Sequence, residues 1–479
     1  MRGRHRRGIA ARAPHHRQLG EGLIRTLRGA VRTAPLLALL LAVAVPSLAA
    51  QSPPAAADAF AGPPAPDPAP AVRALRAELA AVLERASGDG GRRALLVVSL
   101  DRGDTLFSRE PDQPLAPASN LKLYSTAAAL SYLGPAFRWS TYLLAAGEVR
   151  DGVLLGDAVL FGTGDPTLSR RMTDGAPRIL GALADTLRAM GVREVRGDVV
   201  GDGSWFGGQG TGVGWNPDDL RAWYAAPTGA LNADENLAGT RGRPLADPAL
   251  HAAALLRAAL ASRGIAVTGR ARTGFDPAAS PAAFGGSTGG RPALPEARIV
   301  AVHLSPTLAE VAGVTNHVSQ NLFADAMLRT VGRTAQGEGT FAAGARAVRR
   351  LLAEAGADTA EVRILDGSGL SRQDRVTARS TVALLAWMAR GPLAEAYAAS
   401  LPGAAEPGGL KRMYGSPAAG KLRAKTGTIH GVSSLSGYVT TADGERLAFS
   451  IIANGVPDVH RAKRAEDEIG ERLAAFRRR

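Results

Sequence analysis

Residues 116–135 read APASNLKLYSTAAALSYLGP and predict a helix that carries one lysine, Lys122. Gly134 and Pro135 are typical of a helix end, and Ser119 lies three residues before the lysine. If Ser119 opens the helix, the Lys122 amine lies one turn further along the same face, within reach of the serine oxygen. A serine nucleophile with a lysine base requires this arrangement. An isolated S-x-x-K pattern also fits a helix cap followed by a solvated lysine.

Lysine is rare in this chain, since only five of its 57 Lys and Arg residues are lysines: Lys122, Lys411, Lys421, Lys425 and Lys463. Arginine supplies positive charge equally well, but its guanidinium stays protonated in proteins. A lysine amine loses its proton more readily when it is buried or lies near a second cation. The scarcity therefore indicates a chemical role for some of these lysines.

Two further motifs support a chemical role for Ser119 and Lys122. Ser319, Gln320 and Asn321 form an S-x-N pattern, and a K-T-G pattern begins at Lys425. Taken singly, Ser319 fits a loop residue that makes hydrogen bonds, and Lys425 fits a surface lysine on an edge strand. S-x-x-K, S-x-N and K-T-G each occur once, in this order, which random placement rarely produces.

The elements around the motifs predict a layered α+β or α/β fold. Two strands are expected in 94–110 and three in 421–455, and a helix at 459–476 with one apolar face covers them. Ser305 and Pro306 suit the N-cap and first position of another helix.

The N-terminal region resembles an export signal. Residues 1–32 carry eight of the 14 net positive charges, and an uncharged apolar run ending in small residues follows. We expect a signal peptide at 1–49 and a Pro/Ala linker at 50–70. An uncleaved anchor is the alternative, but the apolar run is short for a membrane span. The chain has no cysteine, so export without disulfides points to a bacterial envelope or periplasmic protein.

The three motifs together resemble those of the penicillin-recognising serine enzymes, which include penicillin-binding proteins and serine β-lactamases. Within this group the chain is most similar to the class C low-molecular-mass penicillin-binding proteins, which are D-alanyl-D-alanine carboxypeptidase/endopeptidases. The similarity extends over nearly everything after the linker and includes the stretches GTGDPTLS, GWNPDDLRAWYAAPTGAL, DGSGLSR and SLPGAAEPGGLKR. It implies an antiparallel sheet with helices on both sides, interrupted by an inserted domain that is mainly β.

The resemblance also implies catalytic roles. Ser119 is expected to attack the penultimate D-alanine carbonyl with Lys122 as base. Ser319, bridged to Lys425, is expected to pass a proton to the departing D-alanine, and Asn321 to hold the substrate amide. Water then hydrolyses the acyl-enzyme, and no cofactor is implied.

Substrate contacts follow from the same resemblance. The third motif is expected to bind the terminal carboxylate through Lys425 and Thr426, with Gly427 beside them, and the N–H group of Thr428 is expected to complete an oxyanion hole with that of Ser119. The family's pocket for the diaminopimelate side chain of the stem peptide maps onto Asp219, Tyr224, Arg372 and His430. His430 departs from the amide-bearing residue of some relatives, and Asp219 and Tyr224 equally fit exposed loop residues.

The domain order follows the family. The catalytic domain is expected at 71–144 and 298–479, and an inserted domain at 145–297. Only the short stretch RGRPLADP stands where longer relatives nest a third domain, so we expect that module to be absent.

Other functions fit less well. The stretch GGQGTGVG at 207–214 lacks the spacing of a nucleotide cradle, the eight histidines form no zinc-peptidase motif, and the localised charge argues against nucleic acid. The expected partners are peptidoglycan stem peptides and β-lactams. The alternatives are a β-lactamase or esterase with the same Ser/Lys site, and a catalytically silent wall-binding protein. No glutamate-bearing loop of a class A β-lactamase is recognisable after Asn321.

Overall fold

The computed structural model describes residues 69–87, 90–274, 299–408 and 410–478, and the backbone of two short paired strands, β9 (Ser287–Thr288) and β10 (Arg291–Pro292). The predicted signal peptide lies outside these residues. So does the predicted linker, except for residues 69 and 70, of which Pro70 already belongs to the first helix. The described residues belong to one compact unit.

A five-stranded antiparallel sheet, with order β12-β13-β14-β1-β2, forms one part of the described chain. Its strands are β1 (Arg92–Ser99), β2 (Thr105–Arg109), β12 (Leu422–Ile429), β13 (Val432–Thr440) and β14 (Arg446–Asn454). They match the five strands predicted from sequence. The C-terminal strands lie beside the N-terminal hairpin because β14 pairs with β1.

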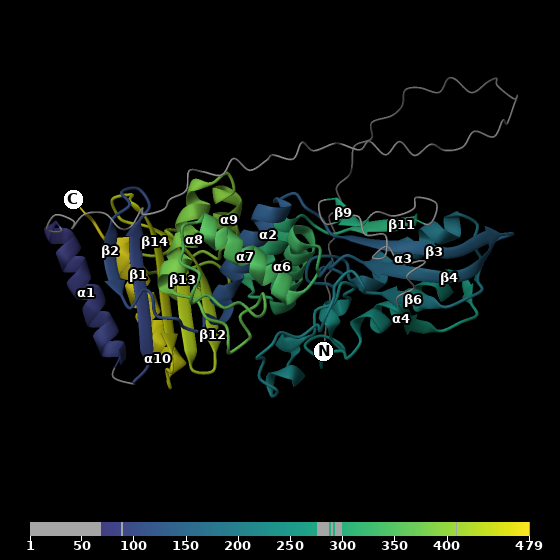
Figure 1. The fold of residues 1–479 in the computed structure, drawn as a ribbon, viewed down its shortest axis with the longest axis horizontal. Coiled ribbons are helices and arrows are strands. Elements are labelled where there is room, and N and C mark those ends of the chain that lie inside the picture. Colours follow the sequence, from purple (N-terminus) through teal and green to yellow (C-terminus); the bar gives the residue numbers. More distant parts are fainter. Residues whose placement is uncertain are drawn as a thin grey trace, which may run out of the picture. The chain divides into compact units, whose positions relative to one another are not determined.

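Helices cover both faces of this sheet. Alternate residues of β1 divide between two hydrophobic clusters: Leu95 and Val97 lie with α1 (Pro70–Ser87) and α10 (Val459–Ala475), whereas Leu96 faces the cluster that contains α8 (Ala378–Arg390). In Figure 1, α1 lies beside β1 and β2, and α8 lies over β13 and β14. Two buried faces explain why the middle of β1, residues 94–98, is continuously apolar.

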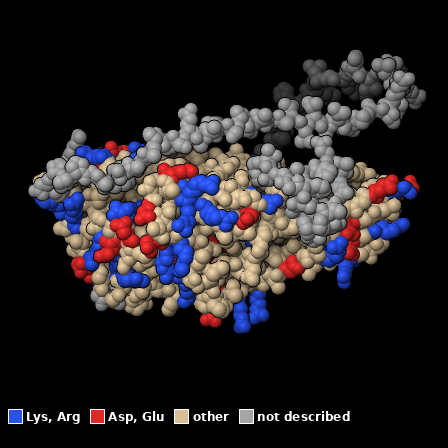
Figure 2. All heavy atoms as spheres, in the orientation of Figure 1, with Lys and Arg blue, Asp and Glu red and all other residues tan. Residues whose placement is uncertain are grey.

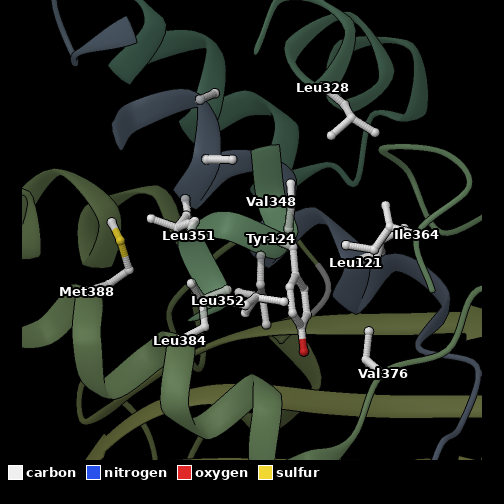
Figure 3. Packing of buried hydrophobic residues seen from close by; sticks show 14 of the residues in the cluster. Leu121, Tyr124, Leu328, Val348, Leu351, Leu352, Ile364, Val376, Leu384 and Met388 are labelled. Atoms are coloured by element: carbon white, nitrogen blue, oxygen red, sulfur yellow. The ribbon is translucent and has the colours of Figure 1, made fainter. Parts of the chain in front are cut away.

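Helix α2 (Leu121–Leu133) runs through the larger cluster, and all its residues from Leu121 to Leu130 are buried. It packs among the remaining helices of this part: α5 (Leu308–His317), α6 (Asn321–Gln336), α7 (Phe341–Glu354) and α9 (Ala394–Ser400). Figure 3 shows Tyr124 of α2 among leucines of α7 and α8, and its hydroxyl bonds to Ser380 and Thr381. Burying such side chains stabilises the fold by about 1.5–3 kcal/mol each. The rigid α2 thereby fixes the position of Lys122.

A second, seven-stranded sheet is formed by the middle of the chain. Its strands are β3 (Ser140–Arg150), β4 (Val153–Gly162), β5 (Glu194–Val195), β6 (Val199–Asp202), β7 (Ala266–Val267), β8 (Ala271–Thr273) and β11 (Ile299–Leu304). Helices α3 (Ala176–Ala189) and α4 (Pro248–Ala261) cover one face, and the 3-10 helices η2 (Asp219–Arg221), η3 (Trp223–Ala225) and η4 (Asp234–Asn236) lie in the loops. Because β3 and β11 both belong to this sheet, it extends beyond the expected limits of 145 and 297. The division into two domains stays a prediction.

The helix expected to begin at Ser305 and Pro306 begins later. The N-cap of α5 is Thr307, whose side chain accepts from the Glu310 N–H group while the Glu310 carboxylate accepts from the Thr307 N–H group over 2.7 Å. This reciprocal capping box fixes the start of the helix. The Ser305 hydroxyl instead accepts from the Trp139 N–H group over 2.9 Å, so the N-cap prediction was wrong by two residues.

Many arginines on the surface pair with carboxylates. Arg85 bonds to Glu468 over 2.7 Å, and Arg472 bonds to Glu78 over 2.8 Å, so both pairs join α1 to α10. Figure 2 shows blue basic side chains beside red acidic ones across the visible face. Exposed pairs of this kind contribute about 0–1 kcal/mol each.

Candidate active site

Ser119 lies in the 3-10 helix η1 (Ala118–Asn120), which leads directly into α2. The preceding residue, Ala118, has a φ of 48°, a conformation that costs energy for a residue with a side chain. Ser119 itself is half-buried, whereas its neighbours in η1 are buried. The strained turn therefore presents one hydroxyl at the surface of the core.

Hydrogen bonds hold this turn against β13. The Ser434 hydroxyl donates to the Pro117 carbonyl over 2.7 Å, and the Asn120 side chain donates to the Ser436 hydroxyl over 2.8 Å. Gly427 of β12 lies in the same contact, because a Cβ atom there would collide with the Ser434 hydroxyl and lie 2.7 Å from the Pro117 carbonyl oxygen. The glycine of the K-T-G motif therefore lets the third motif approach the turn that carries Ser119.

Lys122 is fully buried, and its amine has three hydrogen-bond acceptors. It donates to Ser119 Oγ over 3.0 Å, to Asn321 Oδ1 over 2.7 Å and to the Ser368 carbonyl oxygen over 2.7 Å. An ammonium group has three donors, so all of them are used. The predicted contact between Ser119 and Lys122 is present, and the S-x-N motif meets it at Asn321.

Burial lowers the pKa of Lys122 to about 8, and the nearby carboxyl groups of Asp325 and Asp366 limit the decrease. Near pH 7 about one molecule in ten then carries a neutral amine. An arginine in this position would carry none. The environment therefore suits a lysine that must accept a proton.

A second lysine–serine pair faces the same site. Lys425 is buried on β12, and its Nζ atom donates to Ser319 Oγ over 3.0 Å and to the Thr426 carbonyl oxygen over 2.8 Å. Burial, and then the charge of Lys122, place the pKa of Lys425 well below its usual range. Ser319 itself has a φ of 59°, just before α6 begins, whereas at the first serine the strained residue is its neighbour Ala118.

Asn321 joins α2 and α6 to the middle of the chain. Its Oδ1 atom accepts from Lys122, and its Nδ2 atom donates to the Tyr224 carbonyl oxygen over 2.8 Å. Two opposite partners fix the orientation of the amide. Residues from all three motifs therefore converge, although 199 positions separate Lys122 from Asn321.

The third motif lies on an edge strand. A bridge from Gly403 to Arg423 covers the start of β12, but no described strand pairs with its outer edge alongside Lys425 to Thr428. Thr426 is half-buried and Thr428 is exposed. Such an edge offers backbone N–H and C=O groups to an extended peptide.

The four residues predicted for a side-chain pocket fall into two groups. The Tyr224 hydroxyl donates to Asp219 Oδ1 over 2.8 Å, whereas Arg372 and His430 line a cavity of about 470 Å³ together with Arg375. Arg372 connects the groups electrostatically: the hydrogen bond to Asp219 raises the pKa of Tyr224, and the charge of Arg372 opposes that shift. The structure places them near one another without bringing all four into one cavity lining.

Sequence reasoning gave no role to Ser368, Asp366 and Asp325, which surround Lys122. The stretch DGSGLSR that contains Asp366 and Ser368 was recognised only as a family resemblance. Asp325 is a fully buried carboxyl in α6, and burial and Asp366 hold its pKa well above the usual range. The sequence signal for a role of Asp325 was its position as an acidic residue inside an apolar helical segment.

The described part of the chain contains no group of His, Cys, Asp and Glu side chains arranged to hold a metal ion. Within the same residues, no helix is both long and apolar enough to cross a bilayer.

Comparison with known proteins gives concordant results. A model of the D-Ala-D-Ala carboxypeptidase 3 (S13) family matches residues 75–244 and 240–476. The chain is 34% identical over 443 residues to a D-alanyl-D-alanine carboxypeptidase of Actinomadura sp. (strain R39), covering 80% of this chain and 81% of the relative. It is 33% identical over 402 residues to a carboxypeptidase of Mycobacterium tuberculosis, covering 80% of each chain.

Among solved structures, penicillin binding protein 4 from Haemophilus influenzae superposes with a TM-score of 0.70 at 22% identity. The match covers 82% of this chain and 98% of that one. The predicted fold class, an antiparallel sheet with helices on both sides joined to a further β-containing part, is confirmed.

Proposed function

Because the chain belongs to the D-Ala-D-Ala carboxypeptidase 3 (S13) family, it is a serine-type D-alanyl-D-alanine carboxypeptidase, and we propose that Ser119 is its nucleophile and Lys122 its base. The hydrogen bond of 3.0 Å between Lys122 Nζ and Ser119 Oγ is the observation that carries this assignment. Burial of the amine supports it, because burial favours the neutral form that accepts a proton.

In the first step, the neutral Lys122 amine takes the Ser119 proton while Oγ attacks the carbonyl of the penultimate D-alanine. A bond forms between Oγ and the carbonyl carbon, and the negative charge develops on the carbonyl oxygen. The peptide N–H groups of Ser119 and Thr428 are the proposed oxyanion hole. Thr428 fits this role because it lies at the exposed end of the unpaired edge of β12.

In the second step, the carbon–nitrogen bond breaks, and the terminal D-alanine leaves with a proton delivered through Ser319 and Lys425. The distance of 3.0 Å between these side chains supports a proton path. Lys425 and Thr426 bind the terminal carboxylate, whose negative charge favours the ammonium form of Lys425. Water then cleaves the ester and restores the Ser119 hydroxyl.

Asn321 is proposed to orient both the substrate amide and the Lys122 amine. Gly427 is proposed to serve substrate binding by letting β12 approach the turn that carries Ser119. Beyond this core, Arg372 and His430 are proposed to bind the carboxylate of a diaminopimelate side chain, with Asp219 and Tyr224 toward its amine. The cavity beside β12 and the cationic Arg372 support this assignment.

The cellular setting is proposed on the sequence alone: export by the signal at 1–49, a linker at 50–70, and action on peptidoglycan in the periplasm or envelope. Endopeptidase activity on cross-linked peptides is proposed alongside the carboxypeptidase. The proposed domains are a catalytic part, predicted at 71–144 and 298–479, and an inserted part, predicted at 145–297 and extended outward to include all of β3 and β11, without the nested third domain of longer relatives.

Mass spectrometry of the purified protein with benzylpenicillin tests the proposal. We expect one covalent adduct that persists for many minutes, together with D-alanine release from an N-acylated peptide ending in D-Ala-D-Ala. Rapid penicillin turnover would instead identify a β-lactamase. Absence of both adduct and D-alanine release would identify a silent binding protein.

A further inference from the structure

The glycine-rich stretch before Trp215 packs against the loop that follows Ile364. The Trp215 indole N–H group donates to Asp366 Oδ2 over 2.7 Å, the Ser371 hydroxyl donates to the Val213 carbonyl over 2.7 Å, and the Arg372 N–H group donates to Gly214 over 3.2 Å. These contacts connect a loop of the middle of the chain to the DGSGLSR stretch. Apart from Arg372, which is proposed to bind substrate, and the Ser368 carbonyl, which accepts from Lys122, neither stretch has been given a role so far.

Asp366 organises its own loop. It is fully buried, and besides Trp215 it accepts from the backbone N–H groups of Ser368 (3.0 Å), Gly369 (2.6 Å) and Ser371 (2.8 Å). Hydrogen bonds to a carboxylate are stronger than neutral ones, so four of them define the loop conformation. The loop is also fitted to the nucleophile's turn, because Gly369 has a φ of 79° and a Cβ atom there would collide with the Ala118 carbonyl oxygen.

This loop conformation fixes the direction of the Ser368 carbonyl group. Ser368 turns its carbonyl oxygen toward Lys122, which donates to it over 2.7 Å. Besides Ser119, the Lys122 amine has two hydrogen-bond acceptors. One is the Ser368 carbonyl of this loop, and the other is the Asn321 side chain. The Asn321 amide is itself held by the Tyr224 carbonyl, so both acceptors are tied to the middle of the chain.

We propose that Asp366 and Trp215 are positioning residues for catalysis, which hold the Ser368 carbonyl so that the Lys122 amine points at Ser119. The middle of the chain then serves the reaction itself, because docking of its Trp215 loop completes the support of the base. This inference rests on the proposed role of Lys122. The acylation rate of Lys122→Arg tests that role separately, and acylation of the wild-type protein by penicillin tests the proposed function.

Trp215→Phe is the principal test, with Trp205→Phe as its matched control. Both indoles are buried in the middle of the chain, but the Trp205 N–H group has no hydrogen-bond partner among the described residues. Both variants lose a similar packing volume, and only Trp215→Phe loses the bond to Asp366. The measurement is the second-order rate of benzylpenicillin acylation between pH 6 and 10, with thermal melting to confirm folding.

We expect Trp215→Phe to acylate about 10- to 100-fold more slowly than Trp205→Phe at every pH, since a small displacement of a catalytic group has effects of this size. The pH at which the rate reaches half its maximum should not move, because the charge of Asp366 remains. Asp366→Asn should lower the rate and also move that midpoint to lower pH. The charged groups that face Lys122 are Asp325 of α6, Asp366 of the loop and Lys425 of β12, and this variant removes one of the two carboxyl groups.

Equal acylation rates of the two tryptophan variants, within about twofold, would overturn the inference while leaving the proposed nucleophile and base intact. If the wild-type protein itself forms no penicillin adduct, the proposed function is wrong, and the inference that rests on it is wrong as well. If Asp366→Asn does not fold, the tryptophan pair decides the question alone. A slower Trp215→Phe with an unchanged midpoint supports the inference.

Discussion

Lys425 Nζ lies 3.0 Å from Ser319 Oγ, and this pair repeats the contact of the same length between Lys122 and Ser119. Each lysine is buried, and the charge of Lys122 contributes to the low pKa of Lys425. Each buried lysine therefore loses its proton more readily than an exposed lysine does. Substitution of each serine in turn therefore separates the proposed nucleophile from the proposed proton donor.

Ser119→Ala should abolish both penicillin labelling and D-alanine release, because no oxygen remains to form the acyl-enzyme. Ser319→Ala should still be labelled, at a rate reduced by about 10²- to 10⁴-fold, the range for loss of a proton-transfer group. Peptide mapping of the adduct distinguishes the two hydroxyls. Labelling that survives Ser119→Ala, or that maps to Ser319, would contradict the assignment.

The acylation rate should increase with pH through about pH 8. The pKa of Lys122 is lowered to about 8, and only its neutral form accepts the Ser119 proton, so the active fraction falls about tenfold per pH unit below that value. Stopped-flow or quenched-flow measurement of penicillin acylation between pH 5 and 9 gives the profile. A rate that is constant from pH 6 to 9 would exclude a lysine base with this pKa.

The contact between Ser119 and Lys122 and the strands of the first sheet could be predicted from the sequence, because both depend on local patterns. Apolar runs ended by turn residues gave β1, β2 and the three C-terminal strands, and S-x-x-K required only one helical turn. The start of α5 was missed because Thr307 competes with Ser305 as the N-cap, and only the reach of Glu310 decides between them.

The environment of Lys122 depends on contacts between distant segments. Ser368 contributes a backbone carbonyl, which any residue type would provide, so no side-chain pattern could identify it. Trp215 and Asp366 are 151 positions apart, and their contact follows from how two loops dock. The low pKa of Lys122 similarly requires knowledge of burial, which the helix pattern alone does not give.

Arg372→Ala should reduce kcat/KM about tenfold for peptides that carry a diaminopimelate side chain, chiefly through KM, because a charge-assisted bond to its carboxylate is lost. Peptides with lysine at that position lack the carboxylate and serve as the internal control. An equal loss with both peptides would indicate that Arg372 supports the site in general and does not read the side chain.

Arg329→Met should lower the free energy of unfolding by about 2–4 kcal/mol, since buried carbonyl groups lose their donor. The guanidinium of Arg329 is almost fully buried and donates to the carbonyls of Gly207, Thr228 and Gly339. Arg333→Met is the control: that side chain is partly exposed, so its loss should change stability by about 1 kcal/mol or less. Urea denaturation of both variants gives the comparison, and equal stabilities would show that the carbonyls find other donors.

The variant Lys122→Arg tests whether the proposed base must be a lysine. Arginine keeps the positive charge but cannot give up its proton near neutral pH, so acylation should fall by about 10²- to 10⁴-fold, as expected for loss of a general base. Lys425→Arg is the matched comparison, because that residue is also buried beside a serine hydroxyl and its carboxylate-binding role needs only charge. It should therefore lose less acylation than Lys122→Arg. The measurement is the second-order rate of penicillin acylation for both variants, with circular dichroism to confirm that each is folded. A folded Lys122→Arg protein that acylates at a near-normal rate would show that Lys122 is not the base, whatever its distance from Ser119.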